Sequence, residues 1–337
     1  MKVAFFSCEP WERQYLEQSP ALRQVGVEMF FFDHALDHGH LSSADAAVVS
    51  IFIDSTVDET VFTALPNLKL VVTRSTGYDH IDVAAAKARG VVVASVPSYG
   101  ENTVAEYTFA LLLALSRKIF QSARQVKETG SFKLDGLRGF DLKGKTIGVV
   151  GTGRIGRHVI RMAQGFEMLV VATDARPDSA FAATAGFRYL PLPELLAASD
   201  VVTLHTPYLK ETHHLINAET LGQMKLGAYL INTSRGAVVD TTALAAALGS
   251  GRLGGAALDV LEEEGAIKDE LALLASGHPE EQKLRVLLAD HALMKMPNVI
   301  ITPHNAFNTT EALTRILDTT VEDIVQFVAG HPVNVVS

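Results

Sequence analysis

The sequence predicts an α/β protein built from two doubly wound parallel-sheet domains. Short runs of β-branched residues alternate with helical patterns along the whole chain, which is typical of parallel α/β architecture. The length of 337 residues is too great for one typical domain and suits two. A Gly-x-Gly-x-x-Gly motif stands at 151–156, so enough sequence for a whole domain precedes it.

Residues 1–99 predict the smaller of the two sheets. Its expected strands are the apolar runs at 2–6, 27–32, 46–52, 70–73 and 91–95. A long helix is expected over 104–116. Because this helix is apolar on nearly all sides, we expect it to be buried between domains or subunits. A polar, glycine-containing stretch then leads to the glycine motif.

The residues after the glycine motif predict a complete second sheet. Its expected strands lie at 169–173, 201–205, 228–232, 255–260 and 299–302. Helices such as 241–249 separate them, and 265–297 is expected to be helical and to cover the surface. The final helix, 309–330, has no strand left to serve here and is expected to return to the first domain. The predicted domains are therefore 1–99 with 309–337, and 100–308.

Composition excludes several functional classes. The chain is 48% hydrophobic and 20% charged, which is typical of a globular protein, and its net charge of −9 includes no basic block for nucleic acid. No run approaches the roughly 18 apolar residues of a membrane span, and the first residues lack a signal-peptide core. The single cysteine, Cys8, fits a reducing compartment. We expect a cytoplasmic protein without a metal site.

Residues 147–156 form a dinucleotide-binding fingerprint in the context that such a motif requires. An apolar strand runs directly into Gly-Thr-Gly-Arg-Ile-Gly, and a helix is expected to follow. Gly151 permits the tight turn, and Gly153 lets the backbone approach a pyrophosphate. Gly156 lets the helix pack closely on the strand.

The flanks of the fingerprint specify the cofactor. The helix that begins near Arg154 and Ile155 offers unpaired N–H groups and a positive dipole end to phosphates. Asp174 ends the next strand, where a carboxylate accepts hydrogen bonds from the adenine ribose hydroxyls. These features predict NAD, although Arg176 leaves use of NADP open.

Polar residues follow three further strands, at the edge where open α/β sheets bind ligands. Arg235 follows 228–232, Asp259 lies near the end of 255–260 with Glu264 beyond it, and His304 follows 299–302. Oxidation of a 2-hydroxy acid beside a nicotinamide requires these residue types. The fork of an arginine holds the substrate carboxylate and polarises its carbonyl. A histidine exchanges the hydroxyl proton, and a neighbouring glutamate favours the imidazolium.

Each of these residues also has a structural interpretation. Arg235 could form a surface ion pair, and His304 could be a turn histidine. The run Glu262–Glu264 could be a solvated face, and the run itself does not say which carboxylate points inward. Their occurrence at successive strand ends of one nucleotide-binding sheet favours the catalytic interpretation.

The chain resembles the D-isomer-specific 2-hydroxyacid dehydrogenase family, and within it the D-lactate branch, over nearly its whole length. The resemblance rests on VVTRSTGYDHID at 71–82, VPSYGENTVAEYT at 96–108 and TPHNAF at 302–307. It implies a Rossmann NAD-binding domain inserted into a flavodoxin-like substrate domain, and a homodimer formed through the NAD-binding domain. It also implies reversible hydride transfer between NADH and a small 2-keto acid such as pyruvate.

The resemblance assigns roles around the cofactor. Glu264, five residues after Asp259, matches the glutamate that pairs with the catalytic histidine. Asp259 matches an aspartate that helps to hold the nicotinamide carboxamide, and Thr233 a residue that contributes a backbone contact at the same end. The residues that flank the adenosine pocket are His205, Thr206 and Pro207.

The resemblance also places the substrate. Backbone amides of Thr76 and Gly77 match the loop that binds the substrate carboxylate. Tyr99 and Phe307 match residues that close the pocket, and Phe52 is expected to line it, although both phenylalanines could simply pack in a core. The loop departs from its commonest form by carrying Ser-Thr before the glycine, which leaves the substrate open.

Other functions on this scaffold stay open at this point. The substrate could be another small anion, such as hydroxypyruvate or glycerate, glyoxylate, or phosphite. Formate is disfavoured, because formate-type members pair the histidine with glutamine where this chain has Glu264. The chain could also be an NAD-sensing corepressor-like binding protein, which would keep the same residues. The sequence ranks neither these substrates nor the physiological direction.

Overall fold

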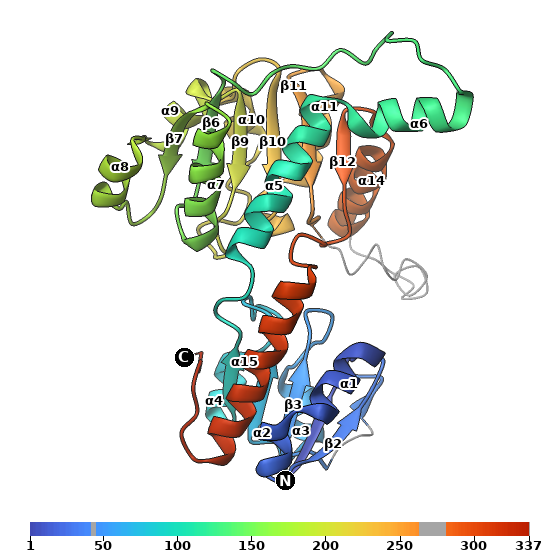
Figure 1. The fold of residues 1–337 in the computed structure, drawn as a ribbon, viewed down its shortest axis with the longest axis vertical. Helices are drawn as coiled ribbons and strands as arrows, with labels where there is room; N and C mark the ends of the chain where they lie inside the picture. The colour runs from blue at the N-terminus through green and yellow to red at the C-terminus, as the bar shows by residue number, and fades with distance from the viewer. Residues whose placement is uncertain (42–44, 263–280, 337) are drawn as a thin grey trace. The chain divides into compact units, whose positions relative to one another are not determined.

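The computed structural model describes residues 1–41, 45–262 and 281–336, which form two compact units (Figure 1). Unit 1 comprises Met1–Gly100 with Asn308–Ser337, and unit 2 comprises Glu101–Phe307. Each unit is an open, parallel sheet with helices on both faces. The predicted fold class, α/β with two doubly wound sheets, is confirmed.

Unit 1 contains five strands in the order β2-β1-β3-β4-β5, which is the flavodoxin-like order. The strands are β1 (Lys2–Phe5), β2 (Glu28–Phe31), β3 (Val48–Ile51), β4 (Leu70–Thr73) and β5 (Val92–Ser95). The helices are α1 (Pro10–Gln18), α2 (Pro20–Gln24), α3 (Glu59–Ala64), α4 (Val83–Ala88) and α15 (Thr310–Val328).

Apolar residues of unit 1 separate onto the two faces of its sheet, because successive side chains of a strand point to opposite faces. One face buries Val3, Phe5 and Val72 against Leu16 of α1, Leu22 of α2, and Leu317 and Ile324 of α15. The final helix therefore serves the first sheet, as predicted. The other face packs against α3 and α4. The end of the chain adds an antiparallel bridge between Val335 and Ala94 of β5, which the sequence did not indicate.

Unit 2 contains seven strands in the order β12-β11-β10-β9-β6-β7-β8. The strands are β6 (Thr146–Val150), β7 (Leu169–Thr173), β8 (Arg188–Tyr189), β9 (Val201–Leu204), β10 (Ala228–Asn232), β11 (Leu253–Leu258) and β12 (Val299–Ile301). The helices are α5 (Glu101–Ser116), α6 (Ile119–Thr129), α7 (Arg154–Gly165), α8 (Ser179–Ala185), α9 (Leu192–Ala198), α10 (Ala218–Gln223), α11 (Thr241–Gly249) and α14 (Glu281–Lys295), with a 3₁₀ turn, η2 (Gly236–Val238). The order is that of a Rossmann sheet with one added strand.

Three elements of unit 2 differ from expectation. Helix α5 is buried, but against the sheet of its own unit: Leu112 and Leu115 pack with Ile147 and Ile231, and α5 lies beside α7 (Figure 1). Its burial therefore comes from its own sheet, and the expected contact with another domain or subunit stays a prediction. Helix α6 and the short strand β8 were not predicted. Of the expected helical segment 265–297, α14 is described, and 265–280 lies outside the described residues.

Each sheet has one switch point, which is the pair of adjacent strands between which the strand order reverses. In unit 2 the strand order reverses between β6 and β9, and in unit 1 between β1 and β3. Ligands of doubly wound sheets bind at the carboxyl ends of such strands. No helix in the described part of the chain is long and apolar enough to cross a membrane.

Candidate active site

The glycine loop of unit 2 closes tightly on its neighbours. Gly151 has a φ of +94°, and a Cβ added there would lie 2.6 Å from the carbonyl oxygen of His205. A Cβ added to Gly156 would lie 2.1 Å from the carbonyl oxygen of Gly151. An added Cβ at Gly153 meets nothing within 4 Å, so the backbone there faces open space directly before α7 begins at Arg154. This loop fits a pyrophosphate.

The side chains of the first two residues of α7 have different surroundings. Arg154 is exposed and its Nη1 lies 3.7 Å from Oε1 of Glu101. Ile155 is half-buried against the core of unit 2.

Asp174 directly follows β7, and both of its carboxylate oxygens accept hydrogen bonds. Oδ2 accepts hydrogen bonds from the amide and the hydroxyl of Thr152 at 2.6 and 3.0 Å, and Oδ1 accepts the amide of Arg176 at 2.8 Å. Burial opposes ionisation, but these hydrogen bonds and the nearby Arg157 outweigh it and lower the pKa of Asp174. The carboxylate is thus charged where the ribose is expected.

Two buried polar atoms belong to residues that follow β9 and lie beside Gly151. His205 donates to or accepts from the Thr203 hydroxyl at 2.9 Å through Nε2, and burial lowers its pKa to about 3, so its ring is neutral. Its Nδ1 and the Oγ1 of Thr206 are buried without a hydrogen-bond partner in the described chain. Buried polar atoms normally have partners, so these two fit a ligand. Pro207 is exposed, and its carbonyl accepts the Thr212 hydroxyl at 2.8 Å.

Arg235 lies directly before η2, at the end of β10. It is half-buried, and its Nη1 donates to the Ser234 carbonyl at 2.8 Å. A Cβ added to Gly236 would lie 1.9 Å from the carbonyl oxygen of Leu261, so only glycine lets this turn approach the end of β11. The carboxyl ends of β10 and β11 therefore meet where Arg235 begins the turn.

Asp259 holds the loop that carries the candidate histidine. Its Oδ1 accepts hydrogen bonds from the Thr302 hydroxyl and, at 2.9 Å, from the Asn305 amide. Its Oδ2 accepts the Ala306 amide at 2.8 Å, and its carbonyl accepts the His304 amide at 2.8 Å. Burial raises the pKa of Asp259, while these donors and His304 oppose the rise. The carboxylate of Asp259 already positions this loop, so any contact with the nicotinamide would be made by the same group.

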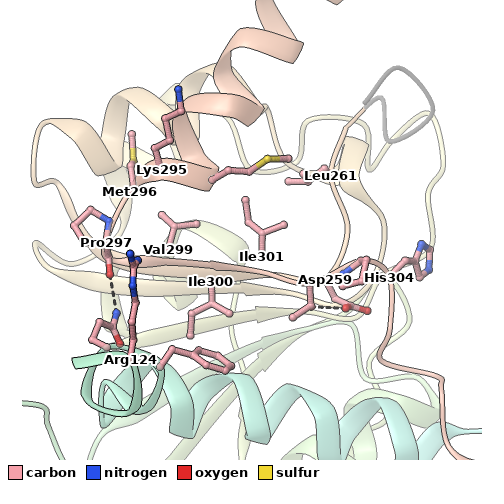
Figure 2. Close-up of a pocket in the computed structure, with 15 residues that line it drawn as sticks. Arg124, Asp259, Leu261, Lys295, Met296, Pro297, Val299, Ile300, Ile301 and His304 are labelled. Atoms are coloured by element: carbon pink, nitrogen blue, oxygen red, sulfur yellow. Dashed lines mark hydrogen bonds between the residues drawn. The ribbon is translucent and has the colours of Figure 1, made fainter. Parts of the chain in front are cut away.

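His304 takes a left-handed backbone conformation, with φ of +51°, which is uncommon for a residue other than glycine. Its ring meets Phe307 edge-on, with centroids 6.5 Å apart. Figure 2 shows Asp259 and His304 at one end of a pocket of about 780 Å³ that continues to Arg124 and Pro297. The pocket follows β12 and its lining is largely apolar, so it is separate from the glycine loop.

The acidic run divides between a described and an undescribed part. Glu262 is nearly buried, and its Oε1 lies 2.7 Å from Nε2 of His214. Its Oε2 accepts the Thr241 amide at 3.4 Å. Glu262 is thus engaged at the start of α11. Glu263 and Glu264 lie outside the described residues.

The loop after β4 in unit 1 has two amides available. Val96 donates its amide to the Ser75 carbonyl at 3.0 Å, and Ser75 donates its hydroxyl to the Gly77 carbonyl at 2.6 Å. The Thr76 hydroxyl donates to the Val96 carbonyl at 2.8 Å. Within the described chain, no hydrogen bond uses the amides of Thr76 or Gly77. A loop fixed in this way leaves two N–H groups that can bind an anion.

The aromatic candidates are divided between the units. Phe52 and Tyr99, both half-buried, follow β3 and β5 of unit 1, as the 75–77 loop follows β4. The Tyr99 carbonyl accepts a hydrogen bond from Nε of Arg315 at 2.6 Å. Phe307 is half-buried and belongs to unit 2, with Arg235 and His304. The structure thus gathers the candidates at the carboxyl edges of both sheets.

Residues 109–306 match the model of the D-isomer specific 2-hydroxyacid dehydrogenase, NAD binding domain. The chain belongs to the D-isomer-specific 2-hydroxyacid dehydrogenases. It is 38% identical to a 2-hydroxyacid dehydrogenase homolog of Zymomonas mobilis and 35% identical to the D-lactate dehydrogenase of Escherichia coli, with 98% of each chain covered in both cases. The expected family, the oxidoreductase activity and NAD as cofactor are thereby confirmed.

A solved structure has the same fold over almost the same length. The D-lactate dehydrogenase of Aquifex aeolicus, complexed with NAD and lactic acid, is 35% identical and has a TM-score of 0.84, covering 98% of this chain and 96% of that one. The fingerprint, the buried polar atoms at the end of β9 and Asp174 agree with an NAD-binding unit in this dehydrogenase.

The sequence missed several residues that organise the site. The Thr302 hydroxyl anchors the histidine loop to Asp259, and the Thr108 hydroxyl, 3.0 Å from that of the predicted Thr233, joins α5 to the end of β10. Thr302 follows β12, and Asp259 follows the neighbouring strand β11, so this placement could have suggested the contact between the two residues. Arg74, which is 2% exposed, gave no signal because its position after β4 looks like that of a loop residue.

Proposed function

We propose that this dehydrogenase reduces pyruvate to D-lactate with NADH and catalyses the reverse reaction. One observation carries the proposal: Arg235 and His304 follow β10 and β12, which flank β11 in an NAD-binding sheet, and Asp259 at the end of β11 holds the histidine loop. The similarity to D-lactate dehydrogenases over nearly the whole chain supports the lactate substrate.

The chemistry follows from the residue types. NADH supplies the hydride that goes to the C2 carbon of the keto acid. Arg235 binds the carboxylate and draws electron density towards the carbonyl oxygen. His304 gives that oxygen a proton and takes it back in the reverse direction. We propose Glu264 as the carboxylate that favours the protonated ring, since Glu262 is engaged with His214.

The substrate-binding residues complete the proposal. The free amides of Thr76 and Gly77 are suited to the second end of the substrate carboxylate. Phe52, Tyr99 and Phe307 limit the size of the group on C2, because half-buried rings leave little room for a bulky side chain. Residues 1–99 with 309–337 then act as the substrate domain, and 100–308 as the cofactor domain.

We assign the cofactor contacts as follows. The backbone of Gly151, Gly153 and the start of α7 binds the pyrophosphate, and Asp174 binds the adenine ribose. His205, Thr206 and Pro207 flank the adenosine, which agrees with the buried atoms that lack partners there. Thr233 and Asp259 lie at the nicotinamide end. The remaining residues assigned to the cofactor are Arg154, Ile155 and Gly156.

We propose a homodimer that forms through unit 2. Helix α6 has no buried residue in the described chain, and Phe120 on it is 53% exposed. Phe132 and Leu134, in the stretch that follows, are 83% and 82% exposed. Surface this apolar commonly marks a protein contact. A cytoplasmic location agrees with the single cysteine, Cys8, which has no second cysteine in the sequence to pair with.

Oxidation of NADH with a panel of keto acids tests this function. Pyruvate, 2-ketobutyrate, phenylpyruvate, glyoxylate and hydroxypyruvate are compared by kcat/KM, and pyruvate is expected to be highest. A clear preference for hydroxypyruvate or glyoxylate would replace the proposed substrate. Tight NADH binding without turnover of any of them would favour the corepressor-like alternative.

A further inference from the structure

Arg74 buries a guanidinium group at the carboxyl edge of the five-stranded sheet. It directly follows β4 and is 2% exposed. Its Nη2 donates to the carbonyl oxygens of Phe6 and Ser7, at 2.8 Å each, and its Nη1 donates to Oγ of Ser50 at 3.4 Å. These acceptors lie at the ends of β1 and β3, the two strands between which the strand order reverses. The side chain therefore reaches across the switch point of unit 1.

The charge of Arg74 is balanced by a buried carboxylate. Its Nε lies 3.6 Å from Oε1 of Glu12, whose other oxygen accepts the Glu9 amide at 2.8 Å at the start of α1. Transfer of a guanidinium from water to an interior is costly, and apolar residues of the same volume are often at least as stable as a buried ion pair. Stability alone is thus a weak reason for an arginine at this position.

Two parts of the proposed substrate pocket adjoin Arg74. The carboxylate-binding loop, 75–77, begins at the next residue. The Cζ of Arg74 also lies 6.0 Å from the ring centroid of Phe52, within the range of a cation–π contact. Arg74 itself is too deeply buried to touch a substrate. Its influence has to act through the ring and through the strand ends that it joins.

We propose that Arg74 is a positioning residue that sets which 2-keto acids fit. Its planar fork fixes the turn after β1 and the ring of Phe52 with respect to the 75–77 loop, so the space beside the bound carboxylate stays small. Without the fork, the ring of Phe52 gains freedom and larger substituents on C2 are accepted. This inference rests on the proposed function and extends it to the choice among 2-keto acids.

Arg74→Lys and Phe52→Leu test the inference. Lysine keeps the charge but loses the two-sided fork. We expect Arg74→Lys to raise the KM for pyruvate about tenfold while kcat changes less than about threefold, as for a lost positioning contact. The kcat/KM ratio of phenylpyruvate to pyruvate is expected to rise about tenfold in both single variants. The Kd for NADH is expected to stay unchanged, since the cofactor binds unit 2.

The double variant and a matched control separate positioning from stability. If Arg74 acts through the ring, Arg74→Lys adds little to the ratio already changed by Phe52→Leu. The control is Arg13→Met, which removes another arginine over a phenylalanine, Cζ 5.2 Å from Phe31, where the arginine is exposed. It is expected to leave the KM and the ratio as in wild type.

The outcomes distinguish the inference from the function on which it rests. A lower Tm in Arg74→Lys, with wild-type KM and substrate ratio, would show a merely structural role and overturn the inference. Additive effects in the double variant would overturn it as well. If wild type reduces none of the five keto acids, the proposed function fails and the inference fails with it. Wild-type activity with unaltered variants overturns the inference alone.

Discussion

The carboxyl edges of the two sheets are each organised by one buried charge, and the two charges have opposite signs. In unit 2, Asp259 is 1% exposed and accepts hydrogen bonds from the loop that carries His304. In unit 1, Arg74 is 2% exposed and donates to the ends of β1 and β3. The carboxylate of Asp259 binds the His304 loop directly, whereas the guanidinium of Arg74 binds strand ends next to the 75–77 loop and does not bind that loop itself. Loss of the first should therefore reduce kcat, and loss of the second should raise KM.

The largest effect is expected from removal of the group that Asp259 positions. His304→Ala should lower kcat for pyruvate reduction by a factor on the order of 10² to 10⁴, the usual contribution of a positioned acid–base group. His331→Ala, which removes an exposed histidine of unit 1, serves as the control and should retain wild-type rates. Similar rates in both variants would return His304 to the role of a turn residue.

A smaller loss is expected when the anchor itself changes. Asp259→Asn places an NH₂ group opposite N–H donors, so one anchoring hydrogen bond of the His304 loop is lost. A displacement of about 1 Å can cost about 10² in rate, so kcat should fall by about that factor while NADH still binds. Asp141→Asn, at an exposed carboxylate of the same unit, should behave as wild type. An unchanged kcat in Asp259→Asn would show that the loop holds its geometry without the charge.

The preference for NADH over NADPH tests the effect of a third charge, the carboxylate of Asp174 in unit 2. Asp174 is held ionised and should repel the 2′-phosphate of NADPH, by about 4 kcal/mol at 4 Å and an effective dielectric constant of about 20 before screening. NADH should therefore have at least a roughly tenfold higher kcat/KM. Equal values for both cofactors would contradict this, and a loss of NADPH activity in Arg176→Gln would then identify the compensating cation.

A buried carboxylate with fewer donors offers a contrast to Asp259. Asp323 of α15 is 1% exposed and accepts a hydrogen bond from the side-chain amide of Asn334 at 2.8 Å. Burial raises its pKa to about 7, and Glu322 adds to the rise while Asn334 opposes it. Because the folded state holds a proton that the unfolded chain releases, stability should fall as pH rises from about 4 to about 7.

Asp323→Asn removes that titration and leaves activity unchanged. Above pH 7 the variant should be more stable than wild type, by at most about 4 kcal/mol, while the two should be similar near pH 4. Tm values at several pH values for both proteins check this. Parallel curves would show that Asp323 does not titrate in this window.

The parts of the site that the sequence predicts are those defined by local spacing. Gly151, Gly153 and Gly156 follow one strand and open one helix, so their roles follow from neighbours in the chain. The order of strands and the return of the final helix follow in the same way from apolar periodicity. Helix α6 was not predicted, although Ile119, Ala123 and Val126 recur at helical spacing, and none of its residues is buried in the described chain.

The contacts that organise the two edges join residues far apart in the sequence. Arg74 meets Phe6 across 68 positions, and Asp259 meets Ala306 across 47. Nothing in the residues near Arg74 indicates that it is buried, and Asp259 on its own suggests a ligand contact more readily than an anchor. The fate of Glu262 likewise depends on His214, 48 positions earlier. Such pairings require the folded chain.

The pH dependence of kcat/KM for pyruvate reduction tests the central claim, that His304 is the acid and Glu264 its partner. Reduction consumes a proton, so activity falls as His304 loses its own at high pH. Removal of a neighbouring negative charge disfavours the protonated ring. In Glu264→Gln the alkaline fall should therefore begin at lower pH than in wild type, whereas Glu262→Gln should superimpose on wild type because Glu262 pairs with His214. A shift in Glu262→Gln, with none in Glu264→Gln, would contradict the assignment.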